Sequence, residues 1–389
     1  MKNKHTLIIF IVLAILFAGS CSTSKEEIGV PQTRNYKAIV ADSVVFEWLS
    51  ELDLLDYNEE AEELLLLDKT SNEVLIINEE GELLSQFNPH IEGPNYVGDY
   101  DFGWTFYGND YLICYGTYYF HLLDKEGKRV KRFPYPVETN GLWMLDYNPR
   151  MLFDYEYQGD DKFVAFITAP QGPSYPSMDY YDSIEMVYAI DVESESGYSI
   201  MSKPESSTYR NLKGYVDHGW PYMTNYFGSK FAQIHSVDSM LYIWNAEGDE
   251  LLNSIVIPKE FQPDYEVKSY GDSGNPDRFR INSNVYSTKD YILLHSLKII
   301  PESINRELRN KYPRYWESEE YREAAQKYMD ANYLVFNEEG FLGELKYETG
   351  PTGVNRLSTK KDFIWKDRRY EDERDYRTFL KVKIVPVEE

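Results

Sequence analysis

Histidine side chains stand at matching places in two apolar runs of this 389-residue chain. His235 ends the run 231–235, His295 ends the run 291–295, and a serine follows each of them. In a repeated β-fold, equivalent strand ends lie at one face, so the two imidazoles could meet there and form a metal site with His218. The alternative is that each His-Ser pair hydrogen-bonds within its own repeat. We favour this alternative and predict no metal site.

The densest mixture of aromatic and polar residues is the stretch 215–222, Tyr-Val-Asp-His-Gly-Trp-Pro-Tyr. Aromatic rings can stack on a sugar, and carboxylates can accept hydrogen bonds from its hydroxyl groups. The candidate ligand-binding residues are therefore Asp217, His218, Trp220, Tyr222, His235 and His295. The alternative is a structural turn rich in Tyr and Trp. Asp217 and a second acid could also form a glycosidase pair, which the distance between the carboxylates would decide.

No motif of high catalytic specificity is present. The sequence has no Gly-x-Ser-x-Gly elbow, no His-Glu-x-x-His, no P-loop and no dinucleotide fingerprint. The run 68–73 lacks the Gly and the closing Glu of an EF-hand loop, so calcium binding is unsupported. We therefore expect no cofactor and favour a binding protein over an enzyme. The alternative is a glycan hydrolase or lyase that uses the three histidines and Asp217 at a central face.

The first residues of the chain form a targeting segment. A short basic stretch precedes the apolar run 7–18, whose twelve residues suit a signal peptide but not a bilayer span of about 20 residues. Small residues then lead to Cys21, as in bacterial lipoprotein signals, although Ala replaces the usual Leu three places before the Cys. We predict a lipoprotein signal peptide over 1–20, lipid attachment at Cys21 and a tether over 21–35.

The tether carries a Lys and two acids, Lys25, Glu26 and Glu27, which resemble the surface-export signal of Bacteroidota lipoproteins. The alternative is a merely solvated tether. We expect an outer-membrane lipoprotein exposed at the cell surface, with a periplasm-facing domain as the alternative. Cys114 is the only other cysteine, so a lipidated Cys21 leaves no intramolecular disulfide.

The formal net charge of the chain is −25, from 65 acidic and 40 basic residues. Such a surface repels phosphate backbones, which argues against a nucleic-acid partner. The expected partners are the membrane, reached through the lipid, and an outer-membrane protein or a glycan.

We expect these candidate residues to be positioned by a β-hairpin that recurs along the chain. A polar turn that contains Gly recurs between two apolar runs, and Gly tolerates the positive φ that such turns need. The copies lie at 78–84, 124–130, 192–198, 245–251 and 337–342. The segments between the repeats are predicted as innermost strands, at 100–107, 141–147, 215–226, 278–286 and 355–358. We predict an all-β fold, a six-bladed β-propeller over 36–389, whose ring closes when the N-terminal run 37–46 pairs with the last strand.

One segment departs from this pattern. The stretch 301–330 predicts a helical insertion in the fifth blade, made of two helices capped by Ser303 and Ser318. The apolar stripes of the two helices are Ile304, Leu308 and Tyr312, and Tyr321, Ala325 and Tyr328. This insertion could project from one rim and dock on a membrane partner.

The first hairpin, 74–87, followed by Ile91-Glu92-Gly93-Pro94-Asn95-Tyr96, resembles a blade of six-bladed, NHL-like β-propellers. The stretch 350–353, Gly-Pro-Thr-Gly, partly repeats this loop. Together with the lipoprotein signal, the mature chain resembles the uncharacterised propeller lipoproteins of Bacteroidota. The resemblance implies the fold and the anchor, but no reaction and no catalytic residue. We predict a membrane-anchored binding or scaffold lipoprotein whose ligand, a glycan, a peptide or a partner protein, is unknown.

Overall fold

The computed structural model describes residues 34–139, 152–157, 160–168, 170–226, 230–346, 356–368, 370, 372 and 374–387. The predicted signal peptide, the lipid site Cys21 and the export signal Lys25, Glu26 and Glu27 lie outside the described residues. So does the segment 141–147, predicted as an innermost strand. Among the helices within the described residues, none is both long and apolar enough to cross a bilayer.

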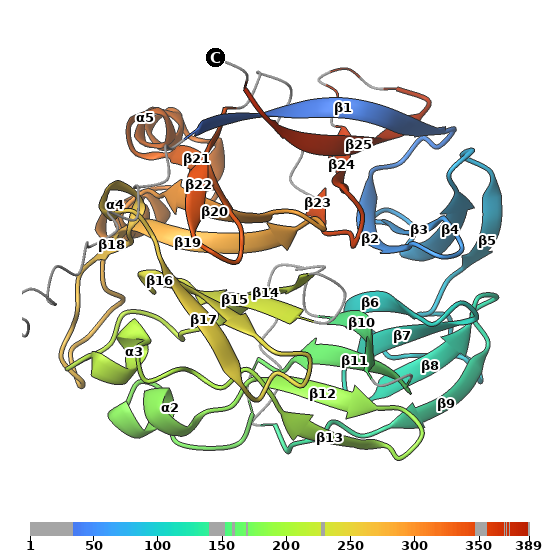
Figure 1. Ribbon diagram of the computed structural model, residues 1–389, viewed down its shortest axis with the longest axis horizontal. Helices are drawn as coiled ribbons and strands as arrows, with labels where there is room; N and C mark the ends of the chain where they lie inside the picture. The colour runs from blue at the N-terminus through green and yellow to red at the C-terminus, as the bar shows by residue number, and fades with distance from the viewer. Residues whose placement is uncertain are drawn as a thin grey trace, which may run out of the picture. The chain divides into compact units, whose positions relative to one another are not determined.

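Most of the described chain forms antiparallel sheets that follow one another around a common centre (Figure 1). Four of these sheets have four strands each, joined in chain order. Their strands are β2 (Leu52–Asn58), β3 (Glu63–Asp68), β4 (Glu73–Asn78) and β5 (Leu83–Phe87); β6 (Asp101–Tyr107), β7 (Tyr111–Gly116), β8 (Phe120–Asp124) and β9 (Arg129–Phe133); β10 (Leu152–Tyr157), β11 (Asp160–Phe166), β12 (Val187–Asp191) and β13 (Ser196–Ser199); and β14 (Pro221–Tyr226), β15 (Lys230–His235), β16 (Met240–Trp244) and β17 (Leu251–Val256).

A fifth sheet of nine strands contains both ends of the described chain, in the order β18-β19-β20-β21-β22-β1-β25-β24-β23. Its strands are β1 (Arg34–Phe46), β18 (Asp264–Tyr265), β19 (Arg278–Ser287), β20 (Ile292–Lys298), β21 (Asp330–Phe336), β22 (Phe341–Lys346), β23 (Arg356–Leu357), β24 (Phe363–Arg368) and β25 (Arg377–Pro386). β1 pairs antiparallel with β25 along most of its length and parallel with β22 at its start. The predicted pairing of the N-terminal run with the last strand is therefore confirmed. It covers an edge that would otherwise be open.

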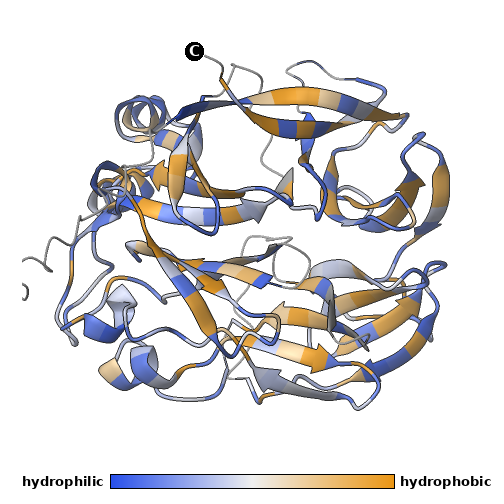
Figure 2. Ribbon diagram, in the orientation of Figure 1, coloured by the Kyte–Doolittle hydropathy of each residue, from blue (hydrophilic) through white to orange (hydrophobic). Residues whose placement is uncertain are grey.

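The middle strands of each sheet are apolar on both faces because neighbouring sheets pack face to face. Leu64 and Leu66 of β3 lie in a core cluster with Trp365, whereas Leu65 lies in a second cluster with Trp104. Successive side chains of a strand point to opposite faces, so one strand contributes to two interfaces. Figure 2 shows the result, with apolar strands inside and polar turns between them.

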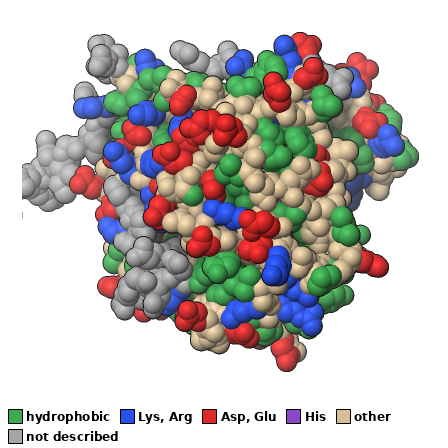
Figure 3. Space-filling view, turned by 90° about the vertical axis from the view of Figure 1, so that its right-hand side faces the viewer, with side chains coloured by type: hydrophobic (Ala, Val, Ile, Leu, Met, Phe, Trp, Pro, Cys, Tyr) green, Lys and Arg blue, Asp and Glu red, His purple; other side chains and the backbone are tan. Residues whose placement is uncertain are grey.

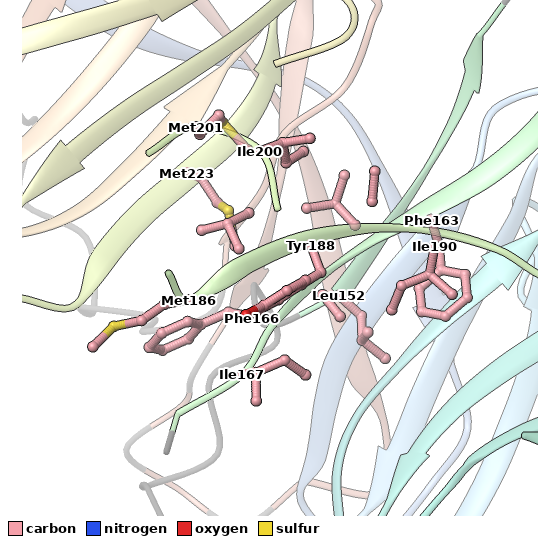
Figure 4. Close-up of a cluster of buried hydrophobic side chains, with 14 of the residues drawn as sticks. Leu152, Phe163, Phe166, Ile167, Met186, Tyr188, Ile190, Ile200, Met201 and Met223 are labelled. Atoms are coloured by element: carbon pink, nitrogen blue, oxygen red, sulfur yellow. The ribbon is translucent and has the colours of Figure 1, made fainter. Parts of the chain in front are cut away.

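The largest core cluster surrounds the third sheet, β10–β13 (Figure 4). Phe163 of β11 and Tyr188 of β12 lie in it with Met223 of β14, so side chains from two sheets meet there. The ring of Phe163 also packs against Phe120 of β8, with ring centroids 5.1 Å apart. Cys114 is fully buried in another cluster, as expected for a small apolar residue of a strand.

The innermost strands differ in part from the prediction. β6 and β19 lie where they were predicted, and β23 covers part of the predicted segment 355–358. The predicted strand 215–226 is shorter, because β14 begins at Pro221 and residues 215–220 form a loop bridged to Lys268. β2 was not predicted, since it lies outside the repeated hairpin. β2 contacts both β6 and β23, so the first of the four-stranded sheets adjoins the end of the chain.

Two helices of ten residues, α4 (Glu302–Lys311) and α5 (Glu319–Tyr328), form the insertion between β20 and β21, with the 3-10 turn η3 (Tyr315–Glu317) between them. Ser318 caps α5 as predicted, because its hydroxyl accepts a hydrogen bond from Tyr321 N–H. The predicted cap Ser303 is wrong. It lies inside α4, and the Asp277 carboxylate accepts its N–H at 2.7 Å, so a residue distant in sequence does the capping. The other helical segments within the described residues are α2 (Met178–Ser183), α3 (Thr208–Asn211) and η2 (Lys259–Phe261).

The Gly of the repeated turn packs against the preceding sheet. A Cβ added at Gly81 would overlap the backbone of Val45, and one added at Gly127 would overlap the ring of Phe87. At Gly248 an added Cβ would come within 2.8 Å of Ile200. All three glycines have positive φ. These three copies of the turn therefore need Gly for their backbone conformation and also for close contact between sheets.

Charged residues of the same turns form ion pairs with the neighbouring sheet. Glu79 pairs with Lys381 at 2.5 Å, Lys125 with Glu63 at 2.6 Å, and Glu338 with Lys230 at 2.8 Å. Each pair joins a turn to a strand of the sheet before it. The turns are thus scaffold elements, as their repetition indicated.

Candidate ligand-binding site

Asp217 lies in the loop before β14, and protein groups surround its carboxylate. The hydroxyl of Tyr209 donates to it at 2.5 Å, the N–H of Gly219 at 2.9 Å and Nη1 of Arg278 at 2.8 Å. Tyr209 belongs to α3 and Arg278 begins β19. The carboxylate therefore fastens the loop to two other elements of the fold.

Aromatic rings pack around this loop. The ring of His218 lies 3.9 Å from that of Tyr175 and is stacked on Trp220 at 5.0 Å, measured between ring centroids. The hydroxyls of Tyr180 and Tyr181, both in α2, donate to the backbone carbonyls of His218 and Asp217. Burial lowers the pKa of His218 and raises that of Tyr180. We call this group the Asp217 cluster, made of Tyr175, Tyr180, Tyr181, Tyr209, Asp217, His218, Trp220 and Arg278.

The contacts in the Asp217 cluster favour the structural-turn interpretation of the stretch 215–222. Its rings cover one another, and its carboxylate already accepts three hydrogen bonds. Tyr222 packs beside this group, against the apolar cluster that contains Ile234 and Leu294. A binding role for these residues stays a prediction.

His235 is buried at the end of β15 and touches the Asp217 cluster through Tyr209, with ring centroids 5.8 Å apart. Its Nδ1 lies 2.9 Å from the carboxylate of Asp238. The same carboxylate accepts hydrogen bonds from the hydroxyl of Ser207 and the N–H of Thr208, at the start of α3. His235 thus helps to hold α3 in place.

His295 lies in β20 and has different partners. Its Nδ1 is 2.6 Å from the hydroxyl of Ser283, and its ring is stacked on Tyr333 at 4.4 Å. These local contacts agree with the alternative in which each histidine hydrogen-bonds near its own strand. Within the described part of the chain, no group of three or more His, Cys, Asp or Glu side chains is arranged to hold a metal ion.

A cavity of about 190 Å³ lies where several innermost strands come together, and we call it the axial pocket. Its lining comes from β2, the turn after β6, β10, β14 and β23 with the residues that follow it. The lining residues are 56–60, 108–109, 152–154, 225 and 357–360. Since five parts of the chain contribute, only the assembled ring forms this pocket.

Hydrogen bonds between sheets hold one side of the axial pocket. The side-chain nitrogen of Asn58 donates to the carbonyl of Gly108 at 3.0 Å and to the amide oxygen of Asn109 at 3.2 Å. The carboxylate of Asp56 accepts the hydroxyl of Thr105 at 2.7 Å. These bonds join the first and second sheets, so the rim of the pocket is preorganised.

The other side of the axial pocket is held by the segment after β23. The hydroxyl of Ser358 accepts hydrogen bonds from Ser287 N–H at 2.8 Å and from the Thr224 hydroxyl at 2.7 Å. The backbone N–H of Lys360 donates to the carboxylate of Glu59. Glu59 is partly buried, and this burial raises the pKa of its carboxyl.

The polar groups of the axial pocket favour particular ligands. Among the described residues that line it, four are acidic, Asp56, Glu59, Glu60 and Asp154, and one is basic, Lys360. This charge disfavours an anionic ligand. Amide and carboxylate oxygens accept hydrogen bonds from hydroxyl, amide and ammonium groups, so the pocket suits a neutral or cationic polar ligand.

Sequence reasoning missed the axial pocket because its residues are far apart in the chain. The available signal was a polar residue at the end of an apolar run, as at Asn58, Asn109 and Asn225. Such residues are also common in plain turns. Only their convergence distinguishes them, and that requires the strand order.

No protein-family model matches this sequence, and no curated protein matches it. Among solved structures, the chain is similar to a member of the DUF4221 family from Bacteroides vulgatus, with 11% identity and a TM-score of 0.58, over 92% of this chain and 100% of that one. It also matches a protein from Bacteroides fragilis described as exported, with 11% identity and a TM-score of 0.49, over 90% and 95% of the two chains. A β-propeller domain of Cps50 (Swd1) from Myceliophteria thermophila matches with 10% identity and a TM-score of 0.41, over 88% and 99%.

The successive sheets around one centre define this protein as a β-propeller. The similarity to the Bacteroides vulgatus structure extends over nearly the whole of both chains. At 11% identity it concerns the fold alone.

Proposed function

We propose that this protein is a six-bladed β-propeller that binds a ligand in its axial pocket and is anchored to the outer membrane by a lipid on Cys21. The blade number rests on dividing the nine-stranded sheet into β19–β22 and β23–β25 with β1. The two halves are joined by parallel pairing between β1 and β22 that covers only Arg34 to Lys37 of β1. Each half then has four antiparallel strands, as the other sheets do, and the two-residue strand β18 is a ninth strand at the edge of the first half.

The axial pocket is the observation that carries the binding role. Its polar side chains come from five parts of the ring, and inter-sheet hydrogen bonds position them without closing the cavity. Ligand sites in folded proteins combine such a concave surface with a few polar groups that converge on it. The ligand classes remain a glycan, a peptide or a partner protein, provided that the part entering the pocket is not anionic.

Binding can be tested with glycan and peptide arrays probed by the purified soluble domain. Glu60 is exposed at the pocket rim, so Glu60→Lys should reduce binding without unfolding the protein. Glu323→Lys, an equally exposed acid on α5, is the matched control and should bind like the wild type. Equal binding by both variants would exclude the axial pocket. Conversion of a bound glycan into products would support the hydrolase or lyase alternative instead.

The anchor needs a separate test, because it rests on the sequence of the first 27 residues. Cys21→Ala should release the protein from membrane fractions and abolish incorporation of a labelled fatty acid. Surface exposure can be tested by protease treatment of intact cells, with replacement of Lys25, Glu26 and Glu27 by alanine as the comparison. Continued membrane association of Cys21→Ala would refute the anchor and leave the binding proposal intact.

A further inference from the structure

A second hollow lies beside the axial pocket. This lateral groove has a volume of about 560 Å³, and its walls come from the turn between β6 and β7, strands β8 and β9, and the turn after β12. Tyr107, Tyr111 and Val130 supply its apolar surface. Asp110, Asp191 and Glu193 supply its carboxylates. The volume lies within the range of about 300–1,000 Å³ for ligand pockets, whereas the axial pocket is smaller.

The two hollows share one wall. Gly108 and Asn109 line both the axial pocket and the lateral groove. Asn58 holds this wall in place by its hydrogen bonds to both residues. Gly108 has no side chain, so backbone alone forms that part of the wall. A ligand that occupies both hollows must cross this turn.

Acidic residues outnumber basic residues in the lining of both hollows. On the side of the molecule seen in Figure 3, acidic and basic side chains are interspersed. Among the described lining residues, the axial pocket has four acids and one lysine, Lys360, and the groove has three acids and one lysine, Lys131. Lys131 is itself paired with Glu195 at 3.2 Å. The combined site therefore attracts positive charge.

We propose that the axial pocket and the lateral groove form one site for an extended peptide with several lysine or arginine residues. This proposal rests on the proposed binding function and names its ligand. The small pocket takes one cationic side chain, whose N–H groups donate to the carboxylate of Glu60 at the rim. The peptide backbone crosses the turn at Gly108. In the groove, Tyr111 and Val130 contact the peptide's apolar side chains, and Glu193 attracts a second cation.

The test uses three probes in fluorescence anisotropy. They are a labelled hexapeptide of alternating lysine and serine, the same peptide with glutamine in place of lysine, and labelled cellohexaose as a neutral oligosaccharide. We expect the lysine peptide to bind at least about tenfold more tightly than the other two. Its affinity should fall as salt is raised from about 0.05 to 0.5 M, because the attraction is electrostatic.

Two variants test whether both hollows take part. Glu60→Lys in the pocket and Glu193→Lys in the groove should each weaken binding of the lysine peptide about tenfold, and Glu323→Lys on α5 should not. Circular dichroism spectra and thermal unfolding confirm that each variant is folded. A lysine tripeptide, too short to span the wall, should be sensitive to Glu60→Lys but not to Glu193→Lys.

The outcomes separate the two proposals. Cellohexaose binding that is lost in Glu60→Lys would keep the binding function and overturn the peptide inference. If Glu193→Lys leaves the affinity for the lysine hexapeptide unchanged, the site is restricted to the pocket, and the inference is also overturned. If the arrays and all three probes show no binding that depends on Glu60, both proposals fail.

Discussion

The polar residues at the two ends of β14 differ in their surroundings. At the start of the strand, Asp217 accepts hydrogen bonds from Tyr209, Gly219 and Arg278 beneath a layer of packed rings. Towards its other end, Asn225 lines a cavity with side chains from four other parts of the chain. In the first group, donors from α3, β19 and the loop itself surround the carboxylate of Asp217. The second group leaves space between its members.

This difference shows why a dense motif can mislead. A stretch rich in Tyr, Trp, His and Asp resembles a binding surface in composition, but the same residues can bury one another. Buried polar groups must find partners, and in the Asp217 cluster the partners come from the protein itself. Binding requires polar groups that are held in position and still face open space, as around the axial pocket.

The largest expected effect is on the Asp217 cluster. Asp217→Ala should lower the free energy of unfolding by about 2–4 kcal/mol, because Tyr209 and Arg278 lose a shared acceptor in a buried setting. Urea denaturation measures this change. Glu60→Ala in the axial pocket is the comparison and should change stability by less than about 0.5 kcal/mol. If Asp217→Ala were as stable as the wild type, the carboxylate would not be structural and its role as a ligand group would regain support.

A smaller effect is expected at the repeated turns, which lie at the same end of the sheets as the axial pocket. Gly127→Ala should destabilise the protein by about 1–3 kcal/mol, because its φ is +79° and an added Cβ would overlap Phe87 of the preceding sheet. Gly340→Ala is the matched control, since nothing lies within 4 Å of a Cβ added there. Thermal unfolding of both variants measures the loss of stability caused by each substitution. Equal losses would mean that the contact between sheets does not matter.

The smallest effect is a dependence of stability on pH. Burial lowers the pKa of His218 in the folded protein. Below about pH 6.5 the unfolded chain therefore binds a proton at this residue more readily than the folded chain does. The free energy of unfolding consequently falls as the pH falls. His121, whose pKa burial lowers to about 4, acts in the same direction. His90 acts oppositely, because its hydrogen bond to Asp101 raises its pKa, and its contribution is lost as pH rises through that value.

Urea denaturation between about pH 5 and 8 can separate these histidines. His218→Gln should reduce the loss of stability on the acidic side by about 1 kcal/mol or less, and His90→Gln should reduce the loss on the basic side. Titration of the imidazole signals by NMR gives the pKa values directly. A value for His218 at or above that of a free histidine would show that its ring is not buried in the cluster.

Much of the fold could be predicted from local patterns. The repeated turns and the apolar runs on either side of them correctly indicated the hairpins, and the unpaired run 37–46 correctly indicated its pairing with the last strand. The cap of α4 could not be predicted, because Asp277 reaches Ser303 from a distant loop. β2 was missed because it lies outside the copies of the repeated hairpin. Local patterns identify elements that depend on neighbours in sequence and fail for those that depend on tertiary contacts.

By itself, the sequence determined that this protein is built from repeated hairpins, because strand alternation and turn chemistry act over a few residues. It also carries the whole case for a lipid anchor, which the described residues do not include. Only the tertiary structure decided which polar residues pack together and which line a cavity. Asn58, Asn109, Asp154 and Asn225 are separated by tens of residues, and only the ring of innermost strands brings them to one pocket. Convergence of this kind depends on strand order and sheet packing, which no short stretch of the sequence contains.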